Sequence, residues 1–167
     1  MSVSFEHLVT EAAALLDVCR ARQLTIATGE SCTGGLIAGI LTEVPGSSDV
    51  VDRGLVTYSN AAKNELLGVP AELIDRHGAV SEPVARAMAE GVLDHSPADL
   101  AVAVTGIAGP GGGTADKPVG LVHLAAIRRG GTIVHERRIF DDNGRSAIRL
   151  DTVAAAITLL LDLAKSG

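Results

Sequence analysis

The chain has 167 residues, a formal net charge of −6, 47% apolar residues and only 2% aromatic residues. This length suits one domain with a substantial buried core, so we expect a single domain over residues 1–167. The acidic balance argues against binding to nucleic acid, which requires a clustered lysine and arginine surface. Residues 1–7 lack the features of a signal peptide, and no apolar stretch approaches the roughly eighteen residues of a membrane span. We therefore expect a cytoplasmic protein with no membrane partner.

The first part of the chain predicts a helix, a strand and a second helix. Apolar residues recur at helical spacing over residues 5–22. Residues 24–28 are typical of a short buried strand, and residues 34–41 predict a helix whose small side chains allow close packing on a sheet. The Pro-Gly-Ser-Ser sequence at residues 45–48 then predicts a loop.

The next part repeats this order with one strand followed by several helices. Residues 50–58 predict a strand, and Ser59 and Asn60 offer an N-cap for a helix that runs to Leu67. A short helix is predicted over residues 71–77. Ser81 is placed to cap a further helix, whose first turn tolerates a proline.

The last part of the chain contains a glycine-rich loop, a hairpin and a final helix. The apolar residues 100–104 predict a strand that enters residues 105–114, which hold too many glycines for a helix or strand. Residues 119–127 and 132–140 flank an Arg-Arg-Gly-Gly sequence, which predicts a β-hairpin. Residues 146–164 predict the closing helix.

This order of elements predicts an α/β fold with three layers, α/β/α, in which the sheet is mostly parallel with an antiparallel edge hairpin. In such sheets, ligands bind outside the carboxyl ends of the strands. The loops that follow the strands ending at Thr28, Tyr58 and Val104 should therefore meet in one site.

Ser31 is the leading candidate nucleophile, because its hydroxyl lies among glycines at the predicted start of a helix. A serine needs a base, and the five histidines lie on predicted helices, a helix end or hairpin strands away from the glycine loops. Lys63 is the better candidate, because an amine that is partly desolvated has a lowered pKa. Cys32 is a rival nucleophile, but it has no evident partner to stabilise a thiolate.

Two further residues of these loops have alternative interpretations. Tyr58, the only tyrosine, either relays a proton to Ser31 or packs as a structural residue. Thr105 and the glycine amides after it either hold an oxyanion or a phosphate, or form a flexible turn.

Other polar groups near the loops are also open to two interpretations. Glu30 is a base or a hydrogen-bond partner for an amide or ribose, or a carboxylate favoured by the positive end of a helix. Thr33 adds a second hydroxyl to the first loop. Arg145 and Arg149 reach a phosphate, or form ion pairs at the surface. No metal is expected, because no cluster of ligand residues has suitable spacing.

Three long motifs of this chain closely resemble those of the CinA C-terminal domain family, which includes nicotinamide-nucleotide amidohydrolases. The resemblance extends from about Leu8 to Leu163 in the same order and spacing. Its motifs are Gly-Glu-Ser-Cys-Thr-Gly-Gly at 29–35, the segment 58–69 that contains Tyr-Ser-Asn and Lys63, and Thr-Gly-Ile-Ala-Gly-Pro-Gly-Gly at 105–112 with Lys-Pro-Val-Gly at 117–120.

The resemblance implies hydrolysis of the carboxamide of nicotinamide mononucleotide to nicotinic acid mononucleotide and ammonia, with no cofactor or metal. It implies that Ser31 is the nucleophile, that Lys63 and Tyr58 activate it, and that Thr105 joins their hydrogen-bonded set. Arg145 is implied to contact the substrate or the transition state. Here the residues before it are Asn143 and Gly144, whereas the family usually has Gly-Asp.

The expected partner is therefore a small pyridine nucleotide. A homo-oligomer is also expected, with a dimer favoured, because an Ala- and Leu-rich domain of this kind is suited to burying a helical face against its own copy. Two alternatives remain: a non-catalytic module that binds nucleotides, and a Ser/Lys amidohydrolase with another amide substrate. The expected substrate-binding residues are Glu30, Thr33, Gly34, Gly106, Gly109, Gly111, Gly112 and Arg145.

Overall fold

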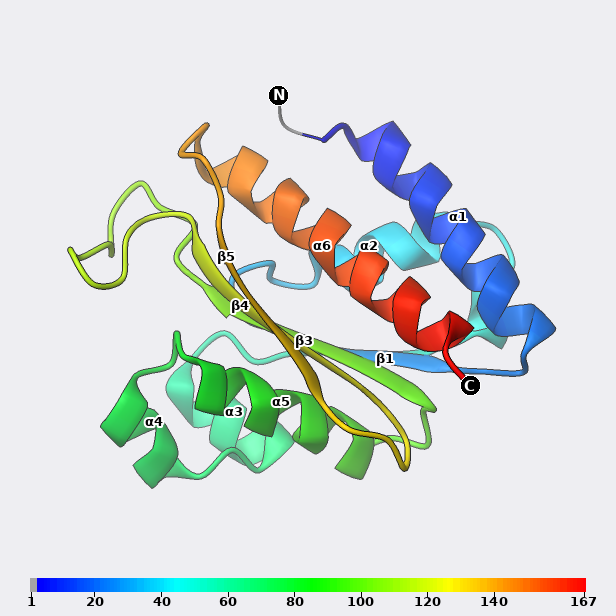
Figure 1. Cartoon of the computed structure of the whole chain (residues 1–167), viewed down its shortest axis with the longest axis horizontal. Coiled ribbons are helices and arrows are strands. Elements are labelled where there is room, and N and C mark those ends of the chain that lie inside the picture. The colour runs from blue at the N-terminus through cyan, green and yellow to red at the C-terminus, as the bar shows by residue number, and fades with distance from the viewer. Residues whose placement is uncertain (1–2) are drawn as a thin grey trace.

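The computed structural model describes residues 3–167, which form a five-stranded sheet between two layers of helices (Figure 1). The strand order is β2-β1-β3-β4-β5. β1 pairs in parallel with β2 and β3, whereas β4 pairs antiparallel with β3 and β5. The predicted three-layer fold with an edge hairpin is confirmed. The strands are β1 (Ile26–Glu30), β2 (Val51–Val56), β3 (Leu100–Gly106), β4 (Leu121–Arg128) and β5 (Val134–Ile139).

Helices cover both faces of the sheet (Figure 1). One layer consists of α1 (Phe5–Ala21), α2 (Leu36–Glu43) and α6 (Arg145–Lys165), with the 3-10 turn η1 (Ser47–Asp49) before β2. The other layer consists of α3 (Asn60–Leu67), α4 (Ala71–His77) and α5 (Glu82–Asp94). Within the described residues, no helix is both long enough and apolar enough to cross a membrane.

Alternating side chains on β3 separate two hydrophobic cores. Val102 and Val104 pack in the core under α1 and α6, whereas Ala101 and Ala103 face α5. The small alanines let α5 lie close to the sheet, and a Cβ at Gly91 of this helix would overlap the carbonyl of Leu67. α5 thereby supports α3, which supplies a residue of the site. Full burial of each large aliphatic side chain contributes about 1.5–3 kcal/mol.

Two boundaries differ from those expected at the site. β1 runs to Glu30 rather than ending at residue 28, so Glu30 belongs to the sheet. α2 begins at Leu36 rather than at residue 34, because Gly34 and Gly35 have φ of 59° and 99°. These left-handed conformations are incompatible with a right-handed helix. A turn of five residues, 31–35, therefore separates β1 from α2.

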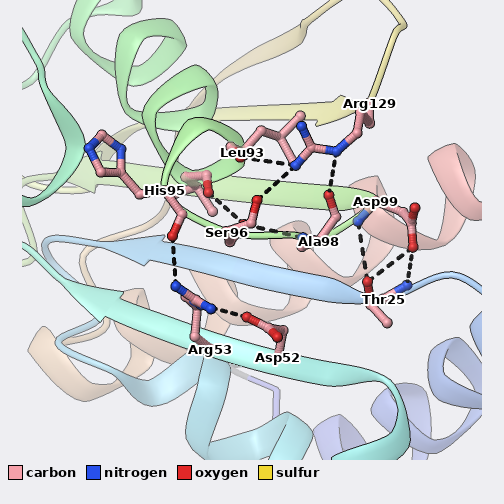
Figure 2. A network of polar contacts seen from close by, with 10 residues as sticks. Thr25, Asp52, Arg53, Leu93, His95, Ser96, Ala98, Asp99 and Arg129 are labelled. Atoms are coloured by element: carbon pink, nitrogen blue, oxygen red, sulfur yellow. Dashed lines mark hydrogen bonds and ion pairs between the residues drawn. The ribbon is translucent and has the colours of Figure 1, made fainter.

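Hydrogen bonds between side chains and backbone close the amino-terminal end of the parallel strands (Figure 2). Asp99 accepts from the Thr25 amide at 2.8 Å and from its hydroxyl at 3.0 Å, which joins the starts of β3 and β1. Arg129, after β4, donates to three carbonyls near the end of α5. These carbonyls belong to Leu93, Ser96 and Ala98, at 2.9–3.0 Å.

Candidate active site

The carboxyl ends of the three parallel strands border a cavity of about 240 Å³. Ser31 and Cys32 come from the turn after β1, Tyr58 and Lys63 follow β2, and Thr105 lies at the end of β3. Parallel strands present their carboxyl ends at one edge of the sheet, which explains why these distant segments meet. The structure therefore brings together the three loops that the sequence selects.

Ser31 and Lys63 form a close pair in this cavity. The Nζ of Lys63 lies 3.0 Å from the Oγ of Ser31 and donates to the carbonyl of Thr57, also at 3.0 Å. Only 1% of the Lys63 surface is exposed. Burial lowers the pKa of Lys63, because removal of water disfavours its charged form. A lysine in this state is suited to accept the proton of the adjacent hydroxyl.

Cys32 lies beside this pair but differs from it chemically. Its thiol is buried, and this burial raises its pKa to about 12. The thiolate is the nucleophilic form of cysteine, so Cys32 is protonated and unreactive at neutral pH. The contrast favours Ser31 over Cys32 as the nucleophile.

Glu30, one of the expected substrate-binding residues, lies outside the cavity lining. Its buried carboxylate accepts from the amides of Ile37 and Ala38 at 2.8 and 3.0 Å. It also accepts from the hydroxyl of Thr33 at 2.7 Å. The N-cap of α2, Gly35, has no side chain, so Glu30 supplies the acceptor that the first amides of this helix require. These contacts agree with the alternative interpretation of Glu30, a carboxylate favoured by the positive end of a helix.

Thr33 and Gly34 also lie outside the cavity lining, within the turn itself. Thr33 is fully buried and uses its hydroxyl on Glu30. Gly34 donates its amide to the carbonyl of Ser31 at 3.0 Å. These residues shape the turn that carries Ser31, and the structure does not bring them to the space that a ligand would occupy.

Tyr58 and Arg145 meet at the cavity, but away from the nucleophile. The Arg145 guanidinium donates to the Tyr58 phenol and to the Gly109 carbonyl, both at 2.8 Å. Tyr58 is 59% exposed, and among residues 3–167 its phenol makes no hydrogen bond to Ser31 or Lys63. The expected proton relay through this phenol is therefore not formed here. Only the Tyr58 main-chain carbonyl approaches Lys63, at 3.4 Å.

The third loop contributes less to the cavity than its glycine content suggests. The Thr105 hydroxyl donates to the carbonyl of Ala79 at 2.9 Å, and Gly106 lies in the cavity wall. Gly109 contacts the site through the carbonyl that binds Arg145. Gly111 and Gly112 are exposed and lie outside the lining.

The charge of the cavity wall is positive. In the part of the chain that the structure describes, Lys63 and Arg145 are the charged residues of this lining, and it contains no carboxylate. Residues 3–167 also contain no group of three or more His, Cys, Asp or Glu placed to hold a metal ion. The site is thus suited to an anionic molecule with a group that a hydroxyl can attack.

Several site residues were missed by sequence reasoning. Ala79 and Val80 form part of the wall between α4 and α5, and small apolar residues carry no signal of such a role. Asn60 also lines the cavity, directly after Ser59, which caps α3 as expected. Arg149 was interpreted as a phosphate contact or a surface ion pair, but it donates to the Cys32 and Thr33 carbonyls in the turn that carries Ser31.

The fold and the site define a three-layer α/β protein with a buried serine and lysine pair at the carboxyl edge of its sheet. A family model described as the CinA C-terminal domain matches residues 9–164, and the chain belongs to this family.

Similar proteins carry corresponding names. A CinA-like protein of Akkermansia muciniphila is 54% identical over 147 residues, which are 87% of this chain and 35% of that protein. A CinA-like protein of Mycolicibacterium vanbaalenii is 57% identical over 136 residues, 81% of this chain and 32% of that protein. The chain therefore spans about a third of the length of these curated relatives.

Solved structures share the whole fold. The crystal structure of a competence/damage inducible protein from Agrobacterium tumefaciens has a TM-score of 0.93 and 50% identity, covering 98% of each chain. A CinA superfamily protein from Klebsiella pneumoniae has a TM-score of 0.88 and 34% identity, covering 97% of this chain and 98% of its own.

Proposed function

We propose that this protein is an amidohydrolase that converts nicotinamide mononucleotide to nicotinic acid mononucleotide and ammonia. One observation carries the proposal: Lys63 is buried, has a lowered pKa and lies 3.0 Å from the Ser31 hydroxyl inside a cavity. Burial, proximity and an altered pKa together are typical of an activated nucleophile. The substrate follows from the resemblance to nicotinamide-nucleotide amidohydrolases and from the positive cavity wall.

In the first half of the reaction, the neutral amine of Lys63 accepts the proton of Ser31 as its Oγ attacks the carboxamide carbon. The amide of Ser31 donates to the Val104 carbonyl at 3.1 Å, so it is already engaged. The next amide in the chain, that of Cys32 in the cavity wall, is our candidate donor to the oxyanion. As the tetrahedral intermediate collapses, the Lys63 ammonium protonates the NH2 group, the carbon–nitrogen bond breaks, and ammonia leaves.

The second half of the reaction restores the enzyme. Lys63 is again neutral and takes a proton from a water molecule, which attacks the ester carbon of the acyl-serine. The carbon–Oγ bond breaks, Ser31 recovers its proton from Lys63, and nicotinic acid mononucleotide is released. No cofactor is needed, because one serine and one amine handle every proton.

The phosphate of the substrate has a suitable partner in this scheme. Arg145, the first residue of α6, lines the cavity beside Tyr58. A guanidinium binds phosphate oxygens through two parallel hydrogen bonds. We assign Arg145 and the Tyr58 phenol to the phosphate and ribose end, and the Ser31 and Lys63 pair to the carboxamide end.

The test is an assay of ammonia and nicotinic acid mononucleotide released from nicotinamide mononucleotide. We expect turnover by the natural sequence and its loss in Ser31→Ala, with Ser48→Ala as the control because Ser48 is an exposed serine remote from the cavity lining. Nucleotide binding without ammonia release would instead identify a binding module. Release of ammonia from other amides, without dependence on a phosphate, would identify a different amidohydrolase.

A further inference from the structure

The turn that carries Ser31 is held by few hydrogen bonds of its own. Within residues 31–35 the Gly34 amide donates to the Ser31 carbonyl at 3.0 Å, and the Leu36 amide donates to the Thr33 carbonyl at 3.1 Å. Gly34 and Gly35 both have positive φ, so this segment forms no regular structure. Side chains outside the turn must therefore contribute to fixing the direction of the Ser31 hydroxyl.

Arg149 of α6 binds the turn from the helix side. Its Nε donates to the Cys32 carbonyl at 3.2 Å, and its Nη2 donates to the Thr33 carbonyl at 2.8 Å. A guanidinium is planar and presents its donors in a rigid fork, so two bonds to consecutive carbonyls fix the orientation of two consecutive peptide groups. Each carbonyl is coplanar with the next amide, so the amides of Thr33 and Gly34 are oriented as well.

Glu30 binds the same turn from the sheet side. Its carboxylate accepts from the Thr33 hydroxyl at 2.7 Å, while the Thr33 carbonyl accepts from Arg149. Thr33 is fully buried between these two charged groups. Thr33 is thus held by two charged side chains: the Glu30 carboxylate, which also accepts from the α2 amides, and the Arg149 guanidinium of α6.

Arg145 and Arg149 divide two tasks on one helix. They are four residues apart, close to one helical turn. Arg145 lines the cavity and bonds to Tyr58, whereas Arg149 lies outside the cavity lining and bonds to the consecutive carbonyls of Cys32 and Thr33. Arg149 is therefore placed to act on the nucleophile without touching a ligand.

We propose that Arg149 is a positioning residue, which keeps the Ser31 hydroxyl within reach of the Lys63 amine by holding the carbonyls of Cys32 and Thr33. This inference rests on the proposed function for its effect on turnover, but the holding of the turn does not depend on the substrate. A misplacement of about 1 Å in a catalytic group costs on the order of 100-fold in rate.

The first test compares turnover in Arg149→Met, Arg149→Lys and Arg138→Met. Methionine keeps much of the apolar length and removes both donors, so we expect kcat to fall about 100-fold while KM changes less than about twofold. Lysine reaches one carbonyl and should retain an intermediate kcat, and guanidinium ions should partly restore Arg149→Met. Arg138→Met removes an exposed ion pair with Glu136 and should leave kcat unchanged. An unchanged kcat, with or without a raised KM, would overturn the proposal.

The second test does not use the substrate. Hydrogen–deuterium exchange of the peptide that contains residues 31–35 should be faster in Arg149→Met than in Arg138→Met, with exchange of α1 unchanged as evidence of an intact fold. Unchanged exchange in the turn overturns the proposal even if the protein has no amidohydrolase activity.

Reaction of Ser31 with a fluorophosphonate connects the two tests. Attack by Oγ forms an oxygen–phosphorus bond and expels fluoride, while Lys63 takes the proton. We expect slower labelling in Arg149→Met than in the natural sequence. Faster exchange combined with equal labelling would show that the turn is held but that the nucleophile does not need it, which also contradicts the proposal.

Discussion

The two ends of the sheet use polar side chains in opposite ways. At the amino-terminal end, Asp99 accepts two hydrogen bonds from Thr25, and Arg129 donates to three backbone carbonyls (Figure 2). At the carboxyl end, Lys63 is buried with a hydroxyl and two carbonyls as its acceptors. Among the described residues, no carboxylate bonds to the Lys63 amine. Hydrogen bonds join the strands at one end, and the other end holds an amine whose charged form is disfavoured by burial.

This difference shows how one fold separates stability from reactivity. A buried lysine without a counter-ion disfavours its own charge, which destabilises the protein at neutral pH but leaves an amine able to accept a proton. An arginine that binds several carbonyls holds the backbone segments together, but it cannot accept a proton because its guanidinium stays protonated.

Replacement of Lys63 by methionine should abolish turnover and leave the fold intact. Removal of a general base costs about 10²- to 10⁴-fold in rate, and an apolar side chain is compatible with a position that is 1% exposed. The measurement is kcat on nicotinamide mononucleotide together with the thermal midpoint, with the exposed Lys165 changed to methionine as the control. Activity within tenfold of the natural sequence would remove Lys63 from the mechanism.

The natural protein should also lose its proposed activity as the pH falls through the pKa of Lys63. Burial lowers this pKa, so the amine becomes neutral at a lower pH than an exposed lysine does. Activity should therefore rise with pH on the acidic limb of the profile, because only the neutral amine accepts the Ser31 proton. An acidic limb that persists in the residual activity of Lys63→Met would assign the limb to another group.

Replacement of Arg129 by methionine should have the opposite signature, with reduced stability and preserved turnover. The change leaves three carbonyls without their donor. Arg129 is exposed, so water replaces part of these hydrogen bonds, and we expect the free energy of unfolding to fall by about 1–2 kcal/mol. Urea denaturation measures this free energy of unfolding. The control is Arg138→Met, which removes only an exposed ion pair. A large loss of kcat with unchanged stability would contradict the division between the two ends.

His123 should make the protein less stable in acid. It lies on β4 opposite Thr105, and its ring stacks on that of His135 at a Nδ1–Nε2 distance of 2.9 Å. Burial, aided by the nearby charge of His135, lowers the pKa of His123 from 6.5 to about 4. Between these values the unfolded chain binds a proton that the folded chain does not, so stability is complete above pH 6.5 and falls toward pH 4.

The measurement is the free energy of unfolding between pH 7 and pH 4.5. His123→Gln should flatten this dependence by up to about 1.4 kcal/mol per pH unit, because each bound proton contributes that slope. His77→Gln, at the end of α4 and outside this pair, is the control. Identical slopes in the natural sequence and in His123→Gln would contradict the prediction.

Much of the site could be predicted from sequence, because parallel strands place their carboxyl ends together wherever the chain goes between them. Ser31 and Lys63 follow β1 and β2, and Thr105 lies at the end of β3, which begins with the apolar run at residues 100–104. The order of strands and helices was enough to predict that these three residues meet in one site. The chemistry of a serine without a nearby histidine then left the lysine as its partner.

The contacts of Glu30 and Arg149 could be recognised only from the three-dimensional structure. Glu30 lies outside the cavity lining, because its contacts depend on where α2 begins, and two glycines with positive φ delay that start. Arg149 binds carbonyls 116 and 117 residues earlier in the chain, and no local pattern reports such contacts. Tyr58 shows the same difficulty, since its phenol is bound to an arginine 87 residues away.

The burial of both cysteines has a practical consequence for spectroscopy. The sequence contains only Cys19 and Cys32, and burial raises their pKa values to about 11 and about 12. Neither thiol forms much thiolate at neutral pH, so maleimide reagents should leave both unmodified. A cysteine introduced at the exposed Ala115, in the loop between β3 and β4, would then accept a single fluorophore (Figure 1). A protein with this single substitution can thus report by fluorescence on a loop that borders the cavity, and neither native cysteine has to be replaced first.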